Sequence, residues 1–177
     1  LHSIRRRQRQ MCIRDRDSEG YDLLGLMTGS EGLLGVITEV IVKILKKPEA
    51  VRAALIGFSS IEDAGQCVSE IIAKGIIPAG MEIMDKALTK ATNDYSKAGY
   101  PIDAEAMMII ELDGTETEVS ELIKRVEDIA KKNKCSSIKI NKSEEERLKF
   151  WAGRKAAFPA CGDLAPDYMC MDGSIPR

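Results

Sequence analysis

Residues 106–112 read AMMIIEL, and residues 116–132 read ETEVSELIKRVEDIAKK. The first stretch is an almost continuous apolar run, which is typical of a buried strand. In the second stretch the apolar residues recur at spacings of three and four, so they share one face of a helix; they are Val119, Leu122, Ile123, Val126, Ile129 and Ala130. We therefore predict a strand followed by an amphipathic helix, and this pair sets the class of the fold.

The alternation of strand and helix extends in both directions from this pair. Ser59 or Ser60 is suited to cap the start of a helix, and Gly75 is suited to end it. Ser143 precedes a run of glutamates, which favours the first turn of a helix. We predict further strands at 52–59, 80–85 and 136–140, and further helices at 61–74, 86–97 and from 143 onward. This order predicts an α+β domain with a mostly antiparallel sheet and helices on one face, like an elaborated ferredoxin-type fold.

A different kind of sequence precedes this domain. Residues Val36–Val42 (VITEVIV) are mostly β-branched, which predicts a strand buried on both faces. Pro48 then interrupts the pattern, because proline disfavours continued pairing. We place a domain boundary near Pro48 and divide the chain into residues 1–16, 17–49 and 50–177.

The opening segment, residues 1–16 (LHSIRRRQRQMCIRDR), is strongly basic. Its six Arg and one Asp give +5, which leaves −7 for the remainder of a chain whose net charge is −2. A basic arm of this kind could bind nucleic acid. The abrupt change at Asp17 favours a scar of cloning or assembly instead, so we exclude this segment, and with it His2, the one histidine of the chain. We expect no nucleic-acid partner.

Composition narrows the class of protein further. Apolar residues make up 44% of the chain and charged residues 31%, which is typical of a soluble globular protein. The five cysteines are odd in number and form no CxxC pair, which indicates reduced thiols in a cytoplasmic protein and no metal site. No apolar run approaches the roughly 20 residues of a membrane span. With His2 set aside, no base that titrates near neutrality remains, so the chain is either no enzyme or an incomplete one.

The first candidate ligand-binding segment is Thr28–Glu39, TGSEGLLGVITE. The spacing of its glycines matches neither a P-loop nor a dinucleotide fingerprint. Closely spaced glycines let the backbone approach a flat or anionic ligand. They also suit a tight turn before a buried strand, and on spacing alone the turn is the favoured interpretation.

The second informative stretch is Phe150–Arg177, FWAGRKAAFPACGDLAPDYMCMDGSIPR. Arg154 falls late in an apolar-aromatic helix, where a guanidinium can hold a carboxylate through two parallel hydrogen bonds. It could equally pair with a neighbouring glutamate on a solvated face, and the residues alone favour neither. For Trp151, core packing is favoured over contact with a ligand. Residues 172–174 (DGS) are expected to form a structural turn.

Together the two stretches resemble the vanillyl-alcohol oxidase / para-cresol methylhydroxylase flavoproteins, and within them the glycolate oxidase / D-lactate dehydrogenase group. The resemblance rests on TGSEGLLGVITE with the following VIVKILKKPE, and on WAGRKAAFP with MDGSIPR; it covers residues 17–177. It implies that residues 17–49 end a PCMH-type FAD-binding domain and that 50–177 form a truncated substrate-side cap.

The resemblance also implies roles for individual residues. Arg154 is the implied ligand of the substrate carboxylate. Phe158 and Cys170 stand where one branch places Thr and Lys against a diacid, which implies a smaller or monocarboxylate substrate. Many members have Thr at the position of Leu33, so a hydroxyl contact is lost there. The implied FAD contacts, mostly through backbone atoms, are Ser30, Glu31, Gly32, Leu33, Gly35, Val36 and Ile37.

For the complete protein the resemblance implies an FAD-dependent 2-hydroxy-acid oxidoreductase that passes a hydride from glycolate or D-lactate to FAD. The catalytic base, and in some branches ligands to a divalent metal, come from a histidine-rich segment beyond Arg177. The electron acceptor could be an iron–sulfur subunit, an electron-transfer flavoprotein or a quinone. We expect the chain alone to bind FAD poorly and to be inactive. The alternative is a free-standing α+β binding or regulatory module in which the glycine stretch is only a turn.

Overall fold

The computed structural model of the chain describes residues 21–171 and residue 173. The chain divides into two compact units, with the division between Leu45 and Lys46. The basic opening, residues 1–16, lies outside the described residues, as does the turn expected at 172–174 apart from Gly173.

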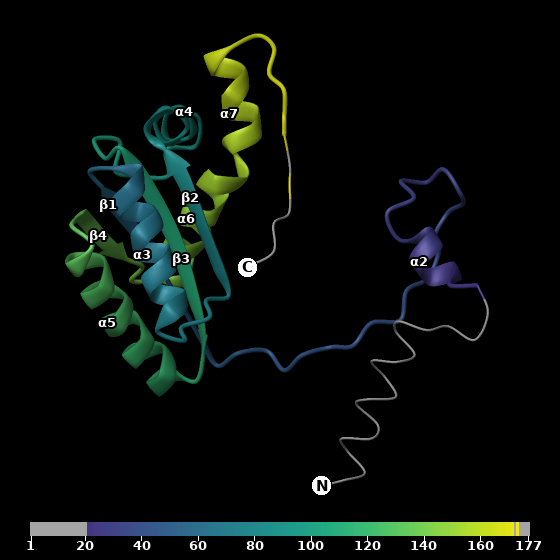
Figure 1. Cartoon of the computed structure of the whole chain (residues 1–177), viewed down its shortest axis with the longest axis horizontal. Coiled ribbons are helices and arrows are strands. Elements are labelled where there is room, and N and C mark those ends of the chain that lie inside the picture. Colours follow the sequence, from purple (N-terminus) through teal and green to yellow (C-terminus); the bar gives the residue numbers. More distant parts are fainter. Residues whose placement is uncertain (1–20, 172, 174–177) are drawn as a thin grey trace, which may run out of the picture. The chain divides into compact units, whose positions relative to one another are not determined.

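The larger unit is built on a four-stranded sheet (Figure 1). The strands run in the order β2-β3-β1-β4, and every neighbouring pair is antiparallel. This is the strand order of a ferredoxin-like fold. The predicted α+β fold with an antiparallel, ferredoxin-like sheet is therefore confirmed. The strands are β1 (Ala50–Phe58), β2 (Gly80–Asp85), β3 (Ala106–Gly114) and β4 (Cys135–Ile140).

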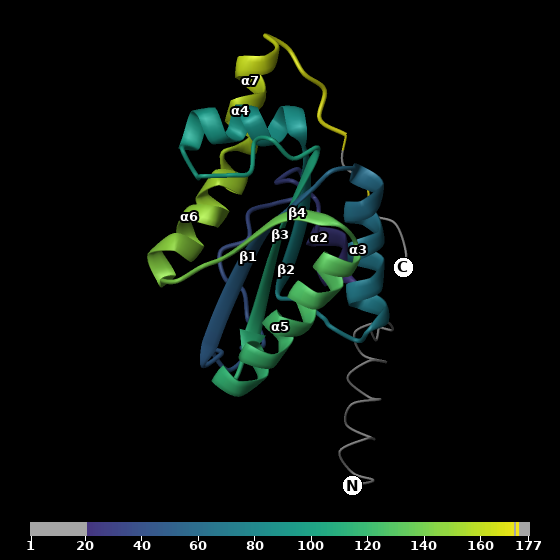
Figure 2. The same ribbon diagram turned by 90° about the vertical axis from the view of Figure 1, so that its left-hand side faces the viewer.

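Two helices, α3 (Ile61–Ala73) and α5 (Glu116–Lys132), cover one face of the sheet (Figure 2). Ser60 caps α3 through a hydrogen bond from the Asp63 amide, and α5 begins with a capping box between Thr115 and Glu118. Their apolar stripes meet the strands in one buried cluster. Its largest members are Ile56, Phe58, Ile71, Ile76, Met108, Ile110, Leu112, Val119 and Val126.

The opposite face of the sheet is also covered, so the expectation of helices on one face only is wrong. The covering helices are α4 (Lys86–Ser96), α6 (Glu144–Lys155) and α7 (Ala157–Leu164), which lie on the other side of the sheet from α3 and α5 (Figure 2). Strands apolar on both faces need two covering layers, and β1 and β3 are of this kind. The second cluster contains Ala53, Leu55, Met84, Ala98, Tyr100, Met107, Ile109, Phe150 and Ala157.

The smaller unit contains the short helix α2 (Leu23–Met27), which Asp22 caps, and then extended coil. The strand predicted at Val36–Val42 does not form, and the side chains of Val36 and Ile41 are 86% and 102% exposed. A strand buried on both faces needs neighbouring strands and two covering layers. The described strands pair only with one another, so this segment has no partner strand among the described residues.

Candidate functional site

Helix α6 carries three side chains on one stripe that faces the sheet. Arg147, Trp151 and Arg154 follow one another at spacings of four and three, which places them on one side of a helix. Ser143 fixes the start of α6, because its hydroxyl accepts a hydrogen bond from the Glu146 amide. The stripe therefore begins at a defined position.

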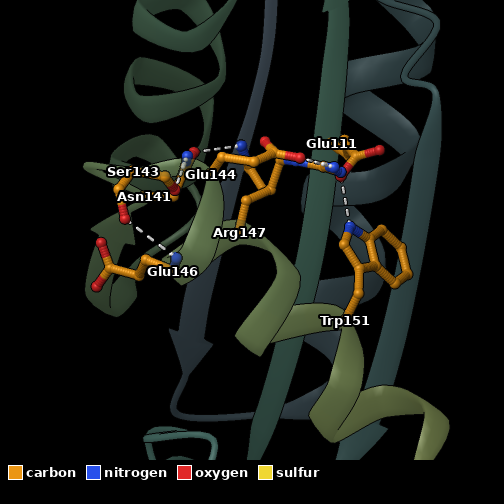
Figure 3. A network of polar contacts seen from close by, with 8 residues as sticks. Glu111, Asn141, Ser143, Glu144, Glu146, Arg147 and Trp151 are labelled. Atoms are coloured by element: carbon orange, nitrogen blue, oxygen red, sulfur yellow. Dashed lines mark hydrogen bonds and ion pairs between the residues drawn. The ribbon is translucent and has the colours of Figure 1, made fainter.

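Glu111 on β3 anchors the first two members of this stripe (Figure 3). Its carboxylate accepts a hydrogen bond from Arg147 Nη1 at 2.6 Å and another from the Trp151 indole nitrogen. Arg147 also donates from Nε and Nη2 to the two oxygens of Glu144, at 2.7 and 2.6 Å. The bonds that Arg147 donates to the two carboxylates, above all those to Glu144, raise the pKa of Arg147. One guanidinium thus joins two carboxylates and holds α6 against the sheet.

Trp151 is a packing residue, as favoured from the sequence. Its ring lies over Gly80 of β2, where an ideal Cβ would be 3.1 Å from the ring carbon Cη2. The ring also borders the second apolar cluster. Gly80 therefore makes room for the indole, and Glu111 binds the indole nitrogen.

The next turn of α6 approaches Tyr100 closely. An ideal Cβ on Gly153 would collide with the Tyr100 hydroxyl and would lie 2.6 Å from the Ala98 Cβ. The Tyr100 hydroxyl donates a hydrogen bond to the Phe150 carbonyl, and burial raises the pKa of this phenol. Glycine at position 153 is thus a condition for seating α6 at this depth.

Arg154 ends the stripe beside Glu82 of β2. Its Nη2 lies 3.4 and 3.5 Å from the two oxygens of Glu82. Among the described residues, Arg154 Nε and Nη1 have no hydrogen-bond acceptor. The side chains of Arg154 and Glu82 are 33% and 41% exposed. Arg154 therefore does pair with a glutamate, one of the two alternatives left open by the sequence, and this pair sits at the edge of a pocket.

The pocket has a volume of about 200 Å³ and a mostly apolar wall. Arg154 and Glu82 supply its charges. A small apolar pocket with a few polar groups is the usual form of a site for a small molecule. Phe158 lines the pocket as expected, whereas Cys170 is exposed and does not. The lining residues are Glu82, Ile83, Met84, Leu88, Arg154, Ala157, Phe158 and Cys161.

The glycine stretch of the smaller unit forms a tight turn. Gly29, Glu31 and Gly32 all have positive φ, of 79°, 51° and 80°. The Ser30 carbonyl accepts from the Leu33 amide at 2.9 Å, which closes the turn. Ser30, Glu31 and Leu33 line a shallow hollow of about 340 Å³, while Val36 and Ile37 lie beyond it in exposed coil.

Part of the backbone of this turn is not covered by other atoms. Beta carbons built on Gly29 and Gly32 would meet nothing within 4 Å, so the backbone is open on that side. Within the described residues, the Glu31 and Gly32 amides donate to no acceptor. Gly35, in contrast, has the Met27 methyl group 3.4 Å from an ideal Cβ.

Comparison with known proteins assigns the chain. Residues 47–177 match the family of FAD linked oxidases, C-terminal domain. The chain belongs to this family. The resemblance deduced from the two motifs is thereby confirmed, and FAD is the cofactor named by the family.

The relatives of this FAD linked oxidase chain are much longer than the chain itself. It is 55% identical to glycolate oxidase subunit GlcD of Escherichia coli (strain K12), over 91% of the chain and 32% of that protein. It is 39% identical to the protein of the same name from Bacillus subtilis, over 92% and 34%. It is 35% identical to D-lactate dehydrogenase [cytochrome] 1 of Saccharomyces cerevisiae, over 80% and 24%. The chain thus spans about a third or less of these proteins.

Solved structures show the same fold. Two structures of alkyldihydroxyacetonephosphate synthase align with TM-scores of 0.57 and 0.59, at 21% and 22% identity. They cover 83% and 82% of this chain, which covers 29% and 30% of theirs. At this identity the likeness establishes the fold alone.

Membrane-spanning helices and metal clusters are both absent from the described part of the chain. None of the helices described is long and apolar enough to cross a membrane. Within residues 21–171 and 173, no three His, Cys, Asp or Glu side chains gather as metal ligands would.

Reasoning from the sequence missed Glu82, although a signal was available. Gly80, Glu82 and Met84 share one face of β2, because side chains alternate along a strand. Glu82 is thus a charged residue on the same face of β2 as the buried Met84, and this placement singles it out as a candidate partner for Arg154.

Proposed function

We propose that this chain supplies the substrate-side cap, residues 50–177, and the end of the FAD-binding domain, residues 17–49, of an FAD-dependent oxidoreductase. Its substrate is a small 2-hydroxy acid, glycolate or D-lactate. The observation that carries the proposal is Arg154, a partly buried guanidinium at the edge of a small apolar pocket. The names of the relatives, which contain glycolate oxidase and D-lactate dehydrogenase, point to the same class of acid.

Arg154 is suited to bind the carboxylate of such an acid. Its Nε and Nη1 have no acceptor among the described residues, so they are available for a charged hydrogen bond. Such bonds are about twice as strong as neutral ones, and their geometry fixes the acid in one orientation. The apolar side chains of the wall are suited to contact the carbon chain of the acid. When bound, FAD supplies the acceptor for the hydride, and the work of this chain is to position the acid.

The glycine turn is proposed as one edge of the FAD site. Support comes from its open backbone at Gly29 and Gly32 and from the exposed apolar chain that follows it. The proposed contacts are Ser30, Glu31, Gly32, Leu33, Gly35, Val36 and Ile37. The base that removes the hydroxyl proton, and any divalent metal, are proposed to come from residues outside this chain.

Further proposals concern partners and location. The names of the glycolate oxidase relatives describe each as a subunit, which supports assembly with other chains. We propose an iron–sulfur subunit or an electron-transfer flavoprotein as the electron acceptor. We propose a cytoplasmic location.

The decisive test is Arg154→Ala in the protein that joins this chain to a complete FAD-binding domain. Removing a charged hydrogen bond to the substrate costs about 2–3 kcal/mol, so kcat/KM for the acid should fall roughly 30- to 150-fold while the flavin spectrum is kept. Arg52→Ala is a matched control, because Arg52 also meets a glutamate, Glu116, at 3.5 Å, away from the pocket. Equal kinetics in wild type and Arg154→Ala would remove Arg154 from the site.

A second test uses the chain by itself. After incubation with FAD and gel filtration, we expect the 177-residue chain to emerge without yellow colour. A retained flavin band would show that the glycine turn and the cap hold the cofactor unaided, contrary to the proposal.

A further inference from the structure

The charge of the pocket is set by two side chains, Arg154 and Glu82. They cancel each other, because Nη2 of Arg154 lies 3.4 and 3.5 Å from the two Glu82 oxygens. The other pocket-lining side chains are uncharged: Ile83, Met84, Leu88, Ala157, Phe158 and Cys161. An acid that binds at Arg154 therefore enters a pocket that starts out neutral and not cationic.

The same helix shows how an arginine of α6 accommodates two carboxylates. Two turns earlier, Arg147 donates a hydrogen bond from Nη1 to Glu111 and two hydrogen bonds, from Nε and Nη2, to Glu144. Arg154 has one carboxylate neighbour, Glu82, on Nη2. Among the described residues, Nε and Nη1 of Arg154 have no acceptor, so Arg154 can bind a second carboxylate and keep its bond to Glu82.

We propose that Glu82 remains beside Arg154 when the substrate binds and selects monocarboxylic against dicarboxylic 2-hydroxy acids. The inference rests on the proposed function. With a monoacid bound, the group of Glu82, Arg154 and substrate carries −1. A second substrate carboxylate makes this −2, with three carboxylates around one guanidinium. Repulsion between like charges across a partly exposed pocket amounts to about a tenfold loss of affinity. Glu82 is thus a positioning and specificity-determining residue.

The test compares acids of equal length that differ in charge. In the FAD-containing protein, kcat/KM is measured for D-2-hydroxybutyrate and D-malate, with D-lactate as the reference. Glu82→Gln keeps the shape of the side chain and removes its charge, while Glu82→Asp keeps the charge. Glu116→Gln, which removes the charge beside Arg52, is the matched control.

We expect Glu82→Gln to raise kcat/KM for D-malate relative to kcat/KM for D-2-hydroxybutyrate about tenfold, through KM more than kcat. The same substitution should leave kcat/KM for D-lactate relative to that for D-2-hydroxybutyrate unchanged. Glu82→Asp and Glu116→Gln should both keep the wild-type ratio. Added salt screens a partly exposed charge, so the same ratio should rise with ionic strength in the wild type and stay level in Glu82→Gln. The wild-type part of this salt series needs no variant to fold.

The outcomes separate the two proposals. Turnover with a ratio that neither Glu82→Gln nor salt changes would overturn the role of Glu82 and leave the role of Arg154 intact. If the wild type oxidises neither these three acids nor glycolate, the proposed function itself fails, and the selection of monoacids fails with it.

Discussion

Replacing Gly153 by alanine tests the claim that α6 is seated on Tyr100 without spare room. The added methyl group would collide with the Tyr100 hydroxyl and lie 2.6 Å from the Ala98 Cβ, closer than such atoms approach in real structures. Tyr100 cannot simply swing away, because it is 5% exposed and its hydroxyl is bonded to the Phe150 carbonyl. Either α6 or the ring must therefore move.

Three terms set the magnitude. Overpacking a buried contact costs about 1–3 kcal/mol. Displacing the tyrosine breaks a buried hydrogen bond, which costs about 1 kcal/mol more. Alanine regains about 1 kcal/mol, since glycine is the poorer helix former. Gly153→Ala should therefore lower the free energy of unfolding by about 1–3 kcal/mol, measured by urea denaturation with circular dichroism as the signal.

Gly65→Ala is the matched control, because Gly65 is also in a helix, α3, and an ideal Cβ there meets nothing within 4 Å. The same chemical change should stabilise the chain at this position by about 0.5–1 kcal/mol. The two substitutions are thus expected to have opposite signs. If Gly153→Ala also stabilises the chain, the close approach of α6 to Tyr100 is wrong.

Three further predictions concern stability and reactivity. The Thr89 hydroxyl is buried without a hydrogen-bond partner among the described residues, so Thr89→Val should raise the free energy of unfolding by about 1 kcal/mol in thermal melts, and a loss would contradict this. Hydrogen bonds from the backbone and side chain of Thr115 hold the pKa of Glu118 below its usual value, so its contribution to stability is present above the unfolded pKa and is lost as the pH falls through the folded value. Glu118→Gln should flatten the acid limb of the stability curve, and an unaltered limb would refute this role. Burial raises the pKa of Cys67 to about 12, so iodoacetamide at neutral pH should label exposed Cys170 and spare Cys67 by peptide mass spectrometry; equal labelling would show an open α3.

Most elements of the larger unit were predictable because they have a local cause. The three- and four-residue spacing over 116–132 gave the bounds of α5, and Ser60 fixes the start of α3. The second helical layer was not predicted. A run such as AMMIIEL indicates a buried strand, but it does not indicate whether helices cover one or both faces of the sheet. That number depends on whether later segments, here α4 and α6, return to the sheet.

The candidate site was also predicted only in part. Arg154 was selected from its helix and its motif, and both are local. Its partner Glu82 was not, because the pairing depends on the register of β2 against β3, in which Gly80 lies opposite Glu111. The strand predicted at Val36–Val42 failed for a related reason. β-branched residues favour the extended conformation, but a β-strand forms only where a neighbouring strand pairs with the segment.

The grip of Arg154 on Glu82 is looser than that of Arg147 on Glu111. The N···O distance is 3.4 Å in the first pair and 2.6 Å in the second. The bonds at Glu111 and the close packing at Gly153 fix α6 against the sheet, so the position of Arg154 is set by the helix and not by its bond to Glu82. Among the described residues, Nε and Nη1 of Arg154 have no acceptor, and a side chain that is held by its helix and keeps two donors is suited to bind a ligand.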